Sequence, residues 1–318
     1  MSKRWIRIAL IALGILGILV IALWLTLRFS SPPPLDPQER SDPRPLPETW
    51  LEPEDEDSLQ ASASPAQSPS TVVAVPADHR TSFSSSGSLA LHADGRPFGE
   101  ESYELDVTEA NTTLVSSGQF QFPAVVTTIR VAFDQRLEAD EHLAPARYEA
   151  FFDAPLGFDR RVRTEIESGI AHIVTGSDER DVPLSEDAVI LGTFSTYALL
   201  PVLFPLRERD GTASFDVLVL GGPPDRGAAE DELPRMSIER LPPLRIRAEG
   251  RTLTLDAYEV TSAFGRSLLL AKEREFMALL AGNEEGSLSV YRIDFFPNGF
   301  EILGDPAGVP RGYSSKVP

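Results

Sequence analysis

Short runs in which apolar and polar residues alternate dominate the chain from residue 83 onward. Leu89, Leu91 and Ala93 alternate with polar neighbours, and the pair Asp94-Gly95 follows them as a turn. Alternation with period two is typical of strands that bury one face. Further runs of this kind cover residues 103–107, 113–122, 125–134, 147–153, 161–167, 170–175, 215–220, 244–247, 252–260, 267–272, 275–280 and 287–296. Evenly spaced short strands predict a mainly β domain, an antiparallel curved sheet forming a half-open barrel or a sandwich, and not βαβ units.

One apolar stretch lacks this alternation. Residues 183–187 are typical of a helix start, with Ser185 as N-cap and two carboxylates in the first turn, where they face the positive end of the helix dipole. The predicted helix ends near Leu200, because Pro201 and then Pro205 interrupt it. It is apolar around most of its circumference, so we expect it to be buried against the sheet.

A helix on the concave side of a curved sheet can leave an apolar space that admits a lipid chain. The side chains expected to bind such a ligand are Leu191, Phe194, Tyr197, Leu200 and Phe204. The alternative is that these residues only fill the core, which is the more common role of buried aromatic side chains.

The N-terminal stretch of residues 8–27 has no charged residue and only Gly14, Gly17 and Thr26 outside the apolar set. A helix of that length matches the hydrocarbon core of a bilayer. Basic residues are in excess before it, which predicts a single-pass plasma-membrane anchor with a cytoplasmic N-terminus and the main domain periplasmic or extracellular. The alternative is a cleaved signal peptide, but the apolar run is long for one and does not end in small residues.

Residues 30–82 are rich in proline, serine and acidic side chains, a composition that predicts a disordered linker. Trp50 and Leu51 are the one apolar pair in its acidic part. The pair could be a short docking site or part of a solvated spacer, and we favour the spacer. The predicted organisation is an anchor over 1–29, the linker over 30–82, a β-rich domain over 83–304 and a tail over 305–318.

Residues 89–105 are echoed by residues 244–260 at one constant offset. In both, an alternating run leads through an acidic residue and glycine, Asp94-Gly95 or Glu249-Gly250, into a second run. The echo could mark two related halves, or two ordinary hairpins that share a turn.

Charge and residue types narrow the chemistry. The net charge of −19 disfavours nucleic acid as a partner, since an acidic surface repels phosphates. There is no cysteine for a disulfide, and the four histidines lack the spacing of metal ligands. Nucleophile and phosphate-binding motifs are absent, so we expect no catalytic residue, metal or cofactor. Glu165 and Glu167 share one face of a strand and could act as a pair on glycosides, although solvated surface residues are the simpler interpretation.

The order of elements resembles that of bacterial envelope domains related to the periplasmic Lol lipoprotein carriers. The similarity lies in the strand at residues 87–91, Gly95, Gly99 and Tyr103, and continues through residues 187–206, the Asp210-Gly211 turn and residues 215–222. It implies a half-barrel wrapped around a helix and possible binding of acyl chains. The departure from those carriers is the predicted anchor and linker. The function expected is a non-enzymatic binding module for a lipid or other apolar ligand, with a scaffold that docks an envelope protein as the alternative.

Overall fold

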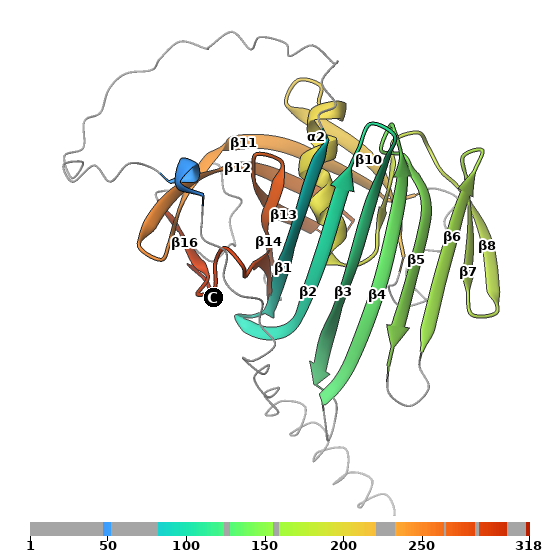
Figure 1. Cartoon of the computed structure of the whole chain (residues 1–318), viewed down its shortest axis with the longest axis horizontal. Coiled ribbons are helices and arrows are strands. Elements are labelled where there is room, and N and C mark those ends of the chain that lie inside the picture. The colour runs from blue at the N-terminus through green and yellow to red at the C-terminus, as the bar shows by residue number, and fades with distance from the viewer. Residues whose placement is uncertain are drawn as a thin grey trace, which may run out of the picture.

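The computed structural model describes residues 47–51, 82–123, 128–154, 159–220, 233–263, 265–283, 286–303 and 316–318. This part of the chain is mainly β, as predicted (Figure 1). Its strands are β1 (Phe83–Ala93), β2 (Arg96–Val107), β3 (Asn111–Pro123), β4 (Thr128–Asp140), β5 (Pro145–Asp153), β6 (Arg160–Glu167), β7 (Ile170–Thr175), β8 (Asp178–Pro183), β9 (Ala188–Leu191), β10 (Thr212–Val219), β11 (Arg235–Ala248), β12 (Arg251–Ser262), β13 (Gly265–Lys272), β14 (Glu275–Asn283), β15 (Gly286–Arg292), β16 (Phe300–Leu303) and β17 (Lys316–Val317). Its helices are the 3-10 helices η2 (Glu48–Trp50) and η4 (Phe194–Leu199) and the α-helix α2 (Leu200–Arg207).

Strand pairing makes one continuous curved sheet. Hairpin neighbours lead from β8 at one edge through β7, β6, β5, β4, β3 and β2 to β1. β1 then pairs with β15, and the sheet continues through β14, β13, β12, β11 and β10 to β9. Every pair along this path is antiparallel except β9 with β10. The predicted antiparallel curved sheet is therefore confirmed, and it is open between β8 and β9.

The helical segment differs from the prediction. The run Ala188–Leu191, expected to be helical, is strand β9, and the α-helix begins only at Leu200. Val189 and Ile190 are β-branched and the whole strand is buried, as is typical of a strand beside a parallel neighbour. Pro201 does not end a helix but lies in its first turn, where no intrahelical donor is needed.

The absence of βαβ units was also predicted wrongly at this place. β9, the helical segment and β10 form one such unit, since β9 and β10 run parallel. Figure 1 shows the helical segment, in yellow, between the teal and green strands that begin the sheet and the orange strands of its second half. The concave face and the helical segment together form the larger apolar core.

β11 bends in its middle and divides the second half of the sheet. The register with β12 shifts between Leu241 and Leu244, on either side of two prolines. Before the bend β11 pairs with β10, and after it with β16. β16 and β17 therefore cover the convex face, where a second apolar core forms. Val317 belongs to that core, although it lies in the predicted tail.

Residues 47–51, inside the predicted linker, lie against this second core. Trp50 is 7% exposed and its ring centroid is 5.5 Å from that of Phe295. Leu51 forms an isolated antiparallel bridge with Leu253 in β12. Treating the Trp50-Leu51 pair as solvated spacer was therefore wrong, because the pair buries its apolar surface on the folded domain.

The two echoed sequence runs are hairpins with the same turn. Asp94-Gly95 joins β1 to β2, and Glu249-Gly250 joins β11 to β12. All four residues have positive φ, from 51° to 79°, the conformation of a two-residue turn that matches strand twist.

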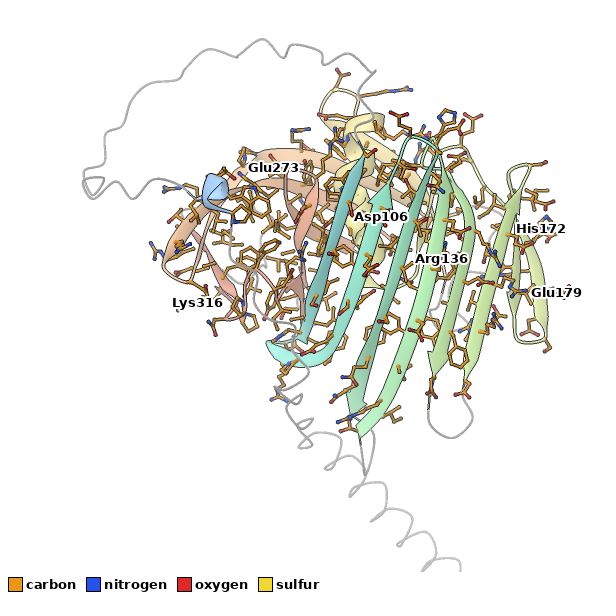
Figure 2. The ribbon with its side chains drawn as sticks, viewed as in Figure 1. Asp106, Arg136, His172, Glu179, Glu273 and Lys316 are labelled. Carbon is orange, nitrogen blue, oxygen red and sulfur yellow. The ribbon has the colours of Figure 1, made fainter. Side chains whose placement is uncertain are left out.

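The remaining expectations concern the surface and the N-terminus. Charged side chains project from the outward face of β2–β8, among them Asp106, Arg136, His172 and Glu179 (Figure 2). No helix in the described part of the chain is long and apolar enough to cross a membrane. Residues 8–27, for which the anchor is predicted, lie outside the described residues.

Arg292, the last residue of β15, connects that strand to β1. Its side chain is fully buried, and its Nε and one terminal nitrogen donate to the Asp294 carboxylate at 2.8 and 2.7 Å. The guanidinium also donates to Tyr103 Oη at 3.0 Å and to the Ser86 carbonyl at 2.8 Å. A Cβ on Gly87 would lie only 2.1 Å from Arg292 Nε, so no larger residue fits there.

Gly87→Ala is expected to lower the free energy of unfolding by about 3 kcal/mol or more, because the methyl group displaces a buried ion pair. Denaturant unfolding of the full chain measures the loss. Ser84→Ala, in the same strand, is the matched control, since it removes only an exposed hydrogen bond to Asp106. Equal losses in the two variants would contradict the packing argument.

Candidate functional site

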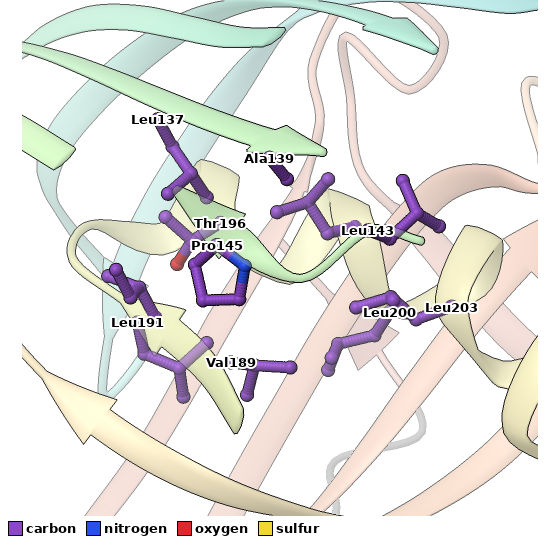
Figure 3. A pocket seen from close by; sticks show the side chains of 11 residues that line it. Leu137, Ala139, Leu143, Pro145, Val189, Leu191, Thr196, Leu200 and Leu203 are labelled. Atoms are coloured by element: carbon purple, nitrogen blue, oxygen red, sulfur yellow. The ribbon is translucent and has the colours of Figure 1, made fainter. Parts of the chain in front are cut away.

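A small apolar cavity lies where α2 meets β4 and β9 (Figure 3). Its volume is about 20 Å³, room for a single water-sized probe. Thr196 brings the one side-chain hydroxyl among the residues that line it. These are Leu137, Ala139, Leu143, Pro145, Val189, Ile190, Leu191, Thr196, Leu199, Leu200 and Leu203. This cavity is too small for an acyl chain in this conformation, and binding one would need the walls to move apart.

The cavity lies at the seam where β9 approaches β5. In the described part of the chain, β9 has a hydrogen-bonded register with β10 and none with β5. Apolar side chains on the turn and strand of one wall therefore face β9 and α2 on the other. Such a seam is held by packing, which can be separated without breaking a backbone ladder.

Leu143 enters the cavity from a strained turn. Its φ of 60° lies in the left-handed region, which costs a side chain about 1–2 kcal/mol. Asp140 holds this turn, because its carboxylate accepts from His142 N at 2.7 Å and Ala144 N at 3.0 Å. The turn thus keeps an apolar side chain buried at the seam, where Leu143 is 8% exposed.

The five side chains predicted to bind a ligand do not all meet. Leu191 and Leu200 line the cavity. Phe194 packs instead against Phe98 and Phe120, each with its ring centroid 6.2 Å away. Tyr197 and Phe204 lie outside the lining. Their role in binding stays a prediction.

Phe204 and Tyr197 lie in surroundings other than the cavity lining. The ring of Phe204 lies 4.8 Å from Tyr258, and the Arg240 guanidinium stands 5.3 Å from the Phe204 centroid. Tyr197 is half-buried by its exposed area, and burial raises the pKa of its hydroxyl. Phe204 therefore serves to fasten α2 to β11 and β12.

A buried carboxylate holds the start of the helical segment. Glu101 is 1% exposed, and its Oε1 accepts from Ser116 Oγ at 2.9 Å and from Thr193 Oγ1. Oε2 has no hydrogen-bond partner. Burial raises the pKa of this carboxyl group, and hydrogen bonds from Ser195, Thr193 and Ser116 act in the opposite direction.

A second set of hydrogen bonds continues from this carboxylate to β5. Ser195 Oγ donates to Ser116 Oγ at 3.0 Å and accepts from Gln135 Nε2 at 2.8 Å. Gln135 Oε1 accepts from Tyr148 Oη at 3.1 Å and from Thr193 N at 3.2 Å. These residues form the Glu101 network, which ties η4 to strands β2–β5.

Gly192 makes room for this network. A Cβ there would lie 2.2 Å from Tyr148 Oη and 2.6 Å from Gln135 Oε1. The network is not among the sequence-based predictions, although the position of Glu101 in β2 indicates a buried carboxylate. Glu101 shares strand parity with Tyr103 and Leu105, so the alternation places a carboxylate among core residues.

The hydrogen bonds of the Glu101 network position the start of the helical segment on the sheet. Ser195 and Glu101 are sealed from solvent, so no substrate reaches their oxygens in this conformation. Glu165 and Glu167 are exposed and lie outside the cavity. Within the described residues, no group of three or more His, Cys, Asp or Glu side chains is arranged to hold a metal ion.

Comparisons with known proteins find similarity to solved structures only. No protein family and no curated protein matches the chain. Among solved structures, it is similar to a DUF1089 family protein from Pseudomonas aeruginosa, with 17% identity and a TM-score of 0.36 over 70% of this chain and 95% of that chain. It is also similar to a β-barrel-like protein of the domain of unknown function DUF1849 from Brucella abortus, with 9% identity and a TM-score of 0.42 over 70% and 97% of the chains.

TM-scores this low carry no argument about function. The strand pairing itself shows one curved, mainly antiparallel sheet, and the two neighbours belong to DUF families, domains of unknown function. Neither is named as a Lol carrier, so the resemblance to those carriers stays a prediction.

Glu101→Gln is expected to flatten the dependence of stability on pH. A raised carboxyl pKa means that the folded chain binds more protons than the unfolded chain above the ordinary value of 4.5, so this group destabilises the fold as the pH rises. Melting temperatures measured from about pH 5 to about pH 8 should fall more for the natural chain than for the variant. Glu104→Gln, exposed in the same strand, is the control. A variant that loses as much stability with pH as the natural chain would contradict the assignment.

Proposed function

We propose that the domain is a non-enzymatic binding module that takes up a lipid or another apolar ligand at the seam between β9 with α2 and the β4–β5 turn. The observation that supports it is the apolar cavity at a seam without a backbone ladder. A ligand inserted there would meet leucine, valine and isoleucine side chains, which favour an apolar chain over a polar molecule.

Uptake would require the helical segment to shift. α2 has only eight residues and contains Pro205, which lacks a backbone N–H for the helix ladder. Helices this short depend on tertiary packing for their stability. A ligand that replaces the contacts of Leu200 and Leu203 with the opposite wall would therefore compensate for moving them.

The strained turn at Leu143 supports the same proposal. Residues held in the left-handed region cluster at ligand clamps and switch regions. Leu143 lines the cavity, and its turn could relax if the walls separated. The membrane anchor predicted for residues 8–27 would place this seam outside the cytoplasm and near a bilayer that supplies acyl chains.

Purified full chain is expected to bind one acyl chain, detected by native mass spectrometry after delipidation and incubation with palmitic acid. Ala139→Leu should weaken binding roughly tenfold or more, because it fills the cavity. Ala213→Leu is the matched control, since Ala213 is also a buried alanine but lies outside the cavity lining.

Two results would count against the proposal. One is the absence of palmitate from the natural chain at saturating ligand. The other is an equal loss of binding in both leucine variants, which would assign the effect to general destabilisation.

A further inference from the structure

Among the described residues, β13 covers only part of one edge of β12. Their register covers Asp256–Ser262, so residues 251–255 lie outside it. On their other side these residues pair with β11. The side opposite β11 is occupied by Leu51, which bridges Leu253, and by Lys272 Nζ, which donates to the Thr254 carbonyl at 3.1 Å.

An apolar surface of the convex core lies beside that edge. Trp50 packs on it, among residues of that core that include Leu253 and Phe295. The Trp50 and Phe295 rings are tilted by 57°, and Phe295 in turn covers the Arg292 guanidinium at 4.4 Å. Phe295 is thus the aromatic part of this surface, and the ion pair of Arg292 with Asp294 supports it from below.

In the described part of the chain, residues 47–51 contact the domain through the packing of Trp50 and through one bridge at Leu51. Residues 47–51 form one helical turn, closed by Trp50 N donating to the Pro47 carbonyl at 2.9 Å, followed by the single bridge at Leu51. One buried tryptophan and one strand-edge contact are the features of a short peptide motif added to a sheet edge. A motif of this size binds weakly as a free peptide and gains occupancy from being on the same chain.

We propose that the edge of β12 at Leu253 and the apolar surface over Phe295 form a peptide-docking site. Residues 47–51 of the same chain bind there reversibly, and we call this segment the latch. Docking of the latch therefore gives the chain a second attachment to the domain, besides β1, which begins at Phe83.

The test uses the full chain and a fluorescent peptide that copies residues 44–57. Trp50→Ala in the full chain removes the side chain that covers Phe295, and the peptide should then bind at this site. The natural chain should bind it at least roughly tenfold more weakly, because its own segment competes. A peptide with alanine in place of its tryptophan should bind neither chain.

A matched pair of variants locates the site. Phe295→Leu, added to the Trp50→Ala chain, should weaken peptide binding, because it removes the aromatic part of this surface. Phe151→Leu in the same background should leave binding unchanged, since Phe151 is 44% exposed on β5. Circular dichroism confirms that each variant is folded.

Several outcomes would overturn the proposal. Peptide binding that is equal for the natural and Trp50→Ala chains, or absent from both, removes the docking site. Binding to the Trp50→Ala chain alone, with none to the natural chain at any concentration, makes the segment a permanent part of the fold. Dimers of the natural chain that depend on Trp50 would assign the occupant to a second copy.

Discussion

The whole domain depends on covering the concave face of one long curved sheet. A sheet that curves without closing exposes the apolar side chains on its inner face, and a chain without cysteine has no disulfide to compensate. The segment from β9 through α2 provides that cover, inserted in the sequence between the two edge regions of the sheet. The Glu101 network ties the start of this segment, at Thr193 and Ser195, to strands β2–β5.

Two buried charged groups organise the core, and each requires a glycine. Arg292 is accommodated by Gly87 and Glu101 by the network beside Gly192. Buried polar groups of this kind are costly unless they are hydrogen-bonded. Glu101 Oε2 has no such partner, but the bonds made by Arg292 and by Glu101 Oε1 restrict the arrangements that the core can adopt. Here they connect strands that are distant in the sequence: Arg292 joins β1 to β15, and the Glu101 network joins β2–β5 to η4.

The two halves of the sheet differ in how many faces they bury. In the first half the convex face is solvated, so from Gly99 to Asp106 every second residue of β2 is buried and the residues between them are more exposed. In the second half β16, β17 and Trp50 cover the convex face, so the run from Leu268 to Ala271 in β13 is buried on both sides. The absence of alternation in β13 thus indicates that a second core covers its convex face. Trp50 is buried because it packs in that core.

The sequence by itself determined most of the strands, because the period of apolar residues depends only on which face of each strand is buried. It did not predict β8, whose side chains are nearly all exposed, nor the short strands β16 and β17. It also determined the hairpin turns, since Asp94-Gly95 and Glu249-Gly250 adopt positive φ locally. Tertiary structure alone decided that Val189 to Leu191 is a strand and that Trp50 is buried, because each depends on a partner far away in the chain. The same is true of Glu101: alternation places it inward, but only the approach of Thr193 and Ser195 gives that carboxylate its partners.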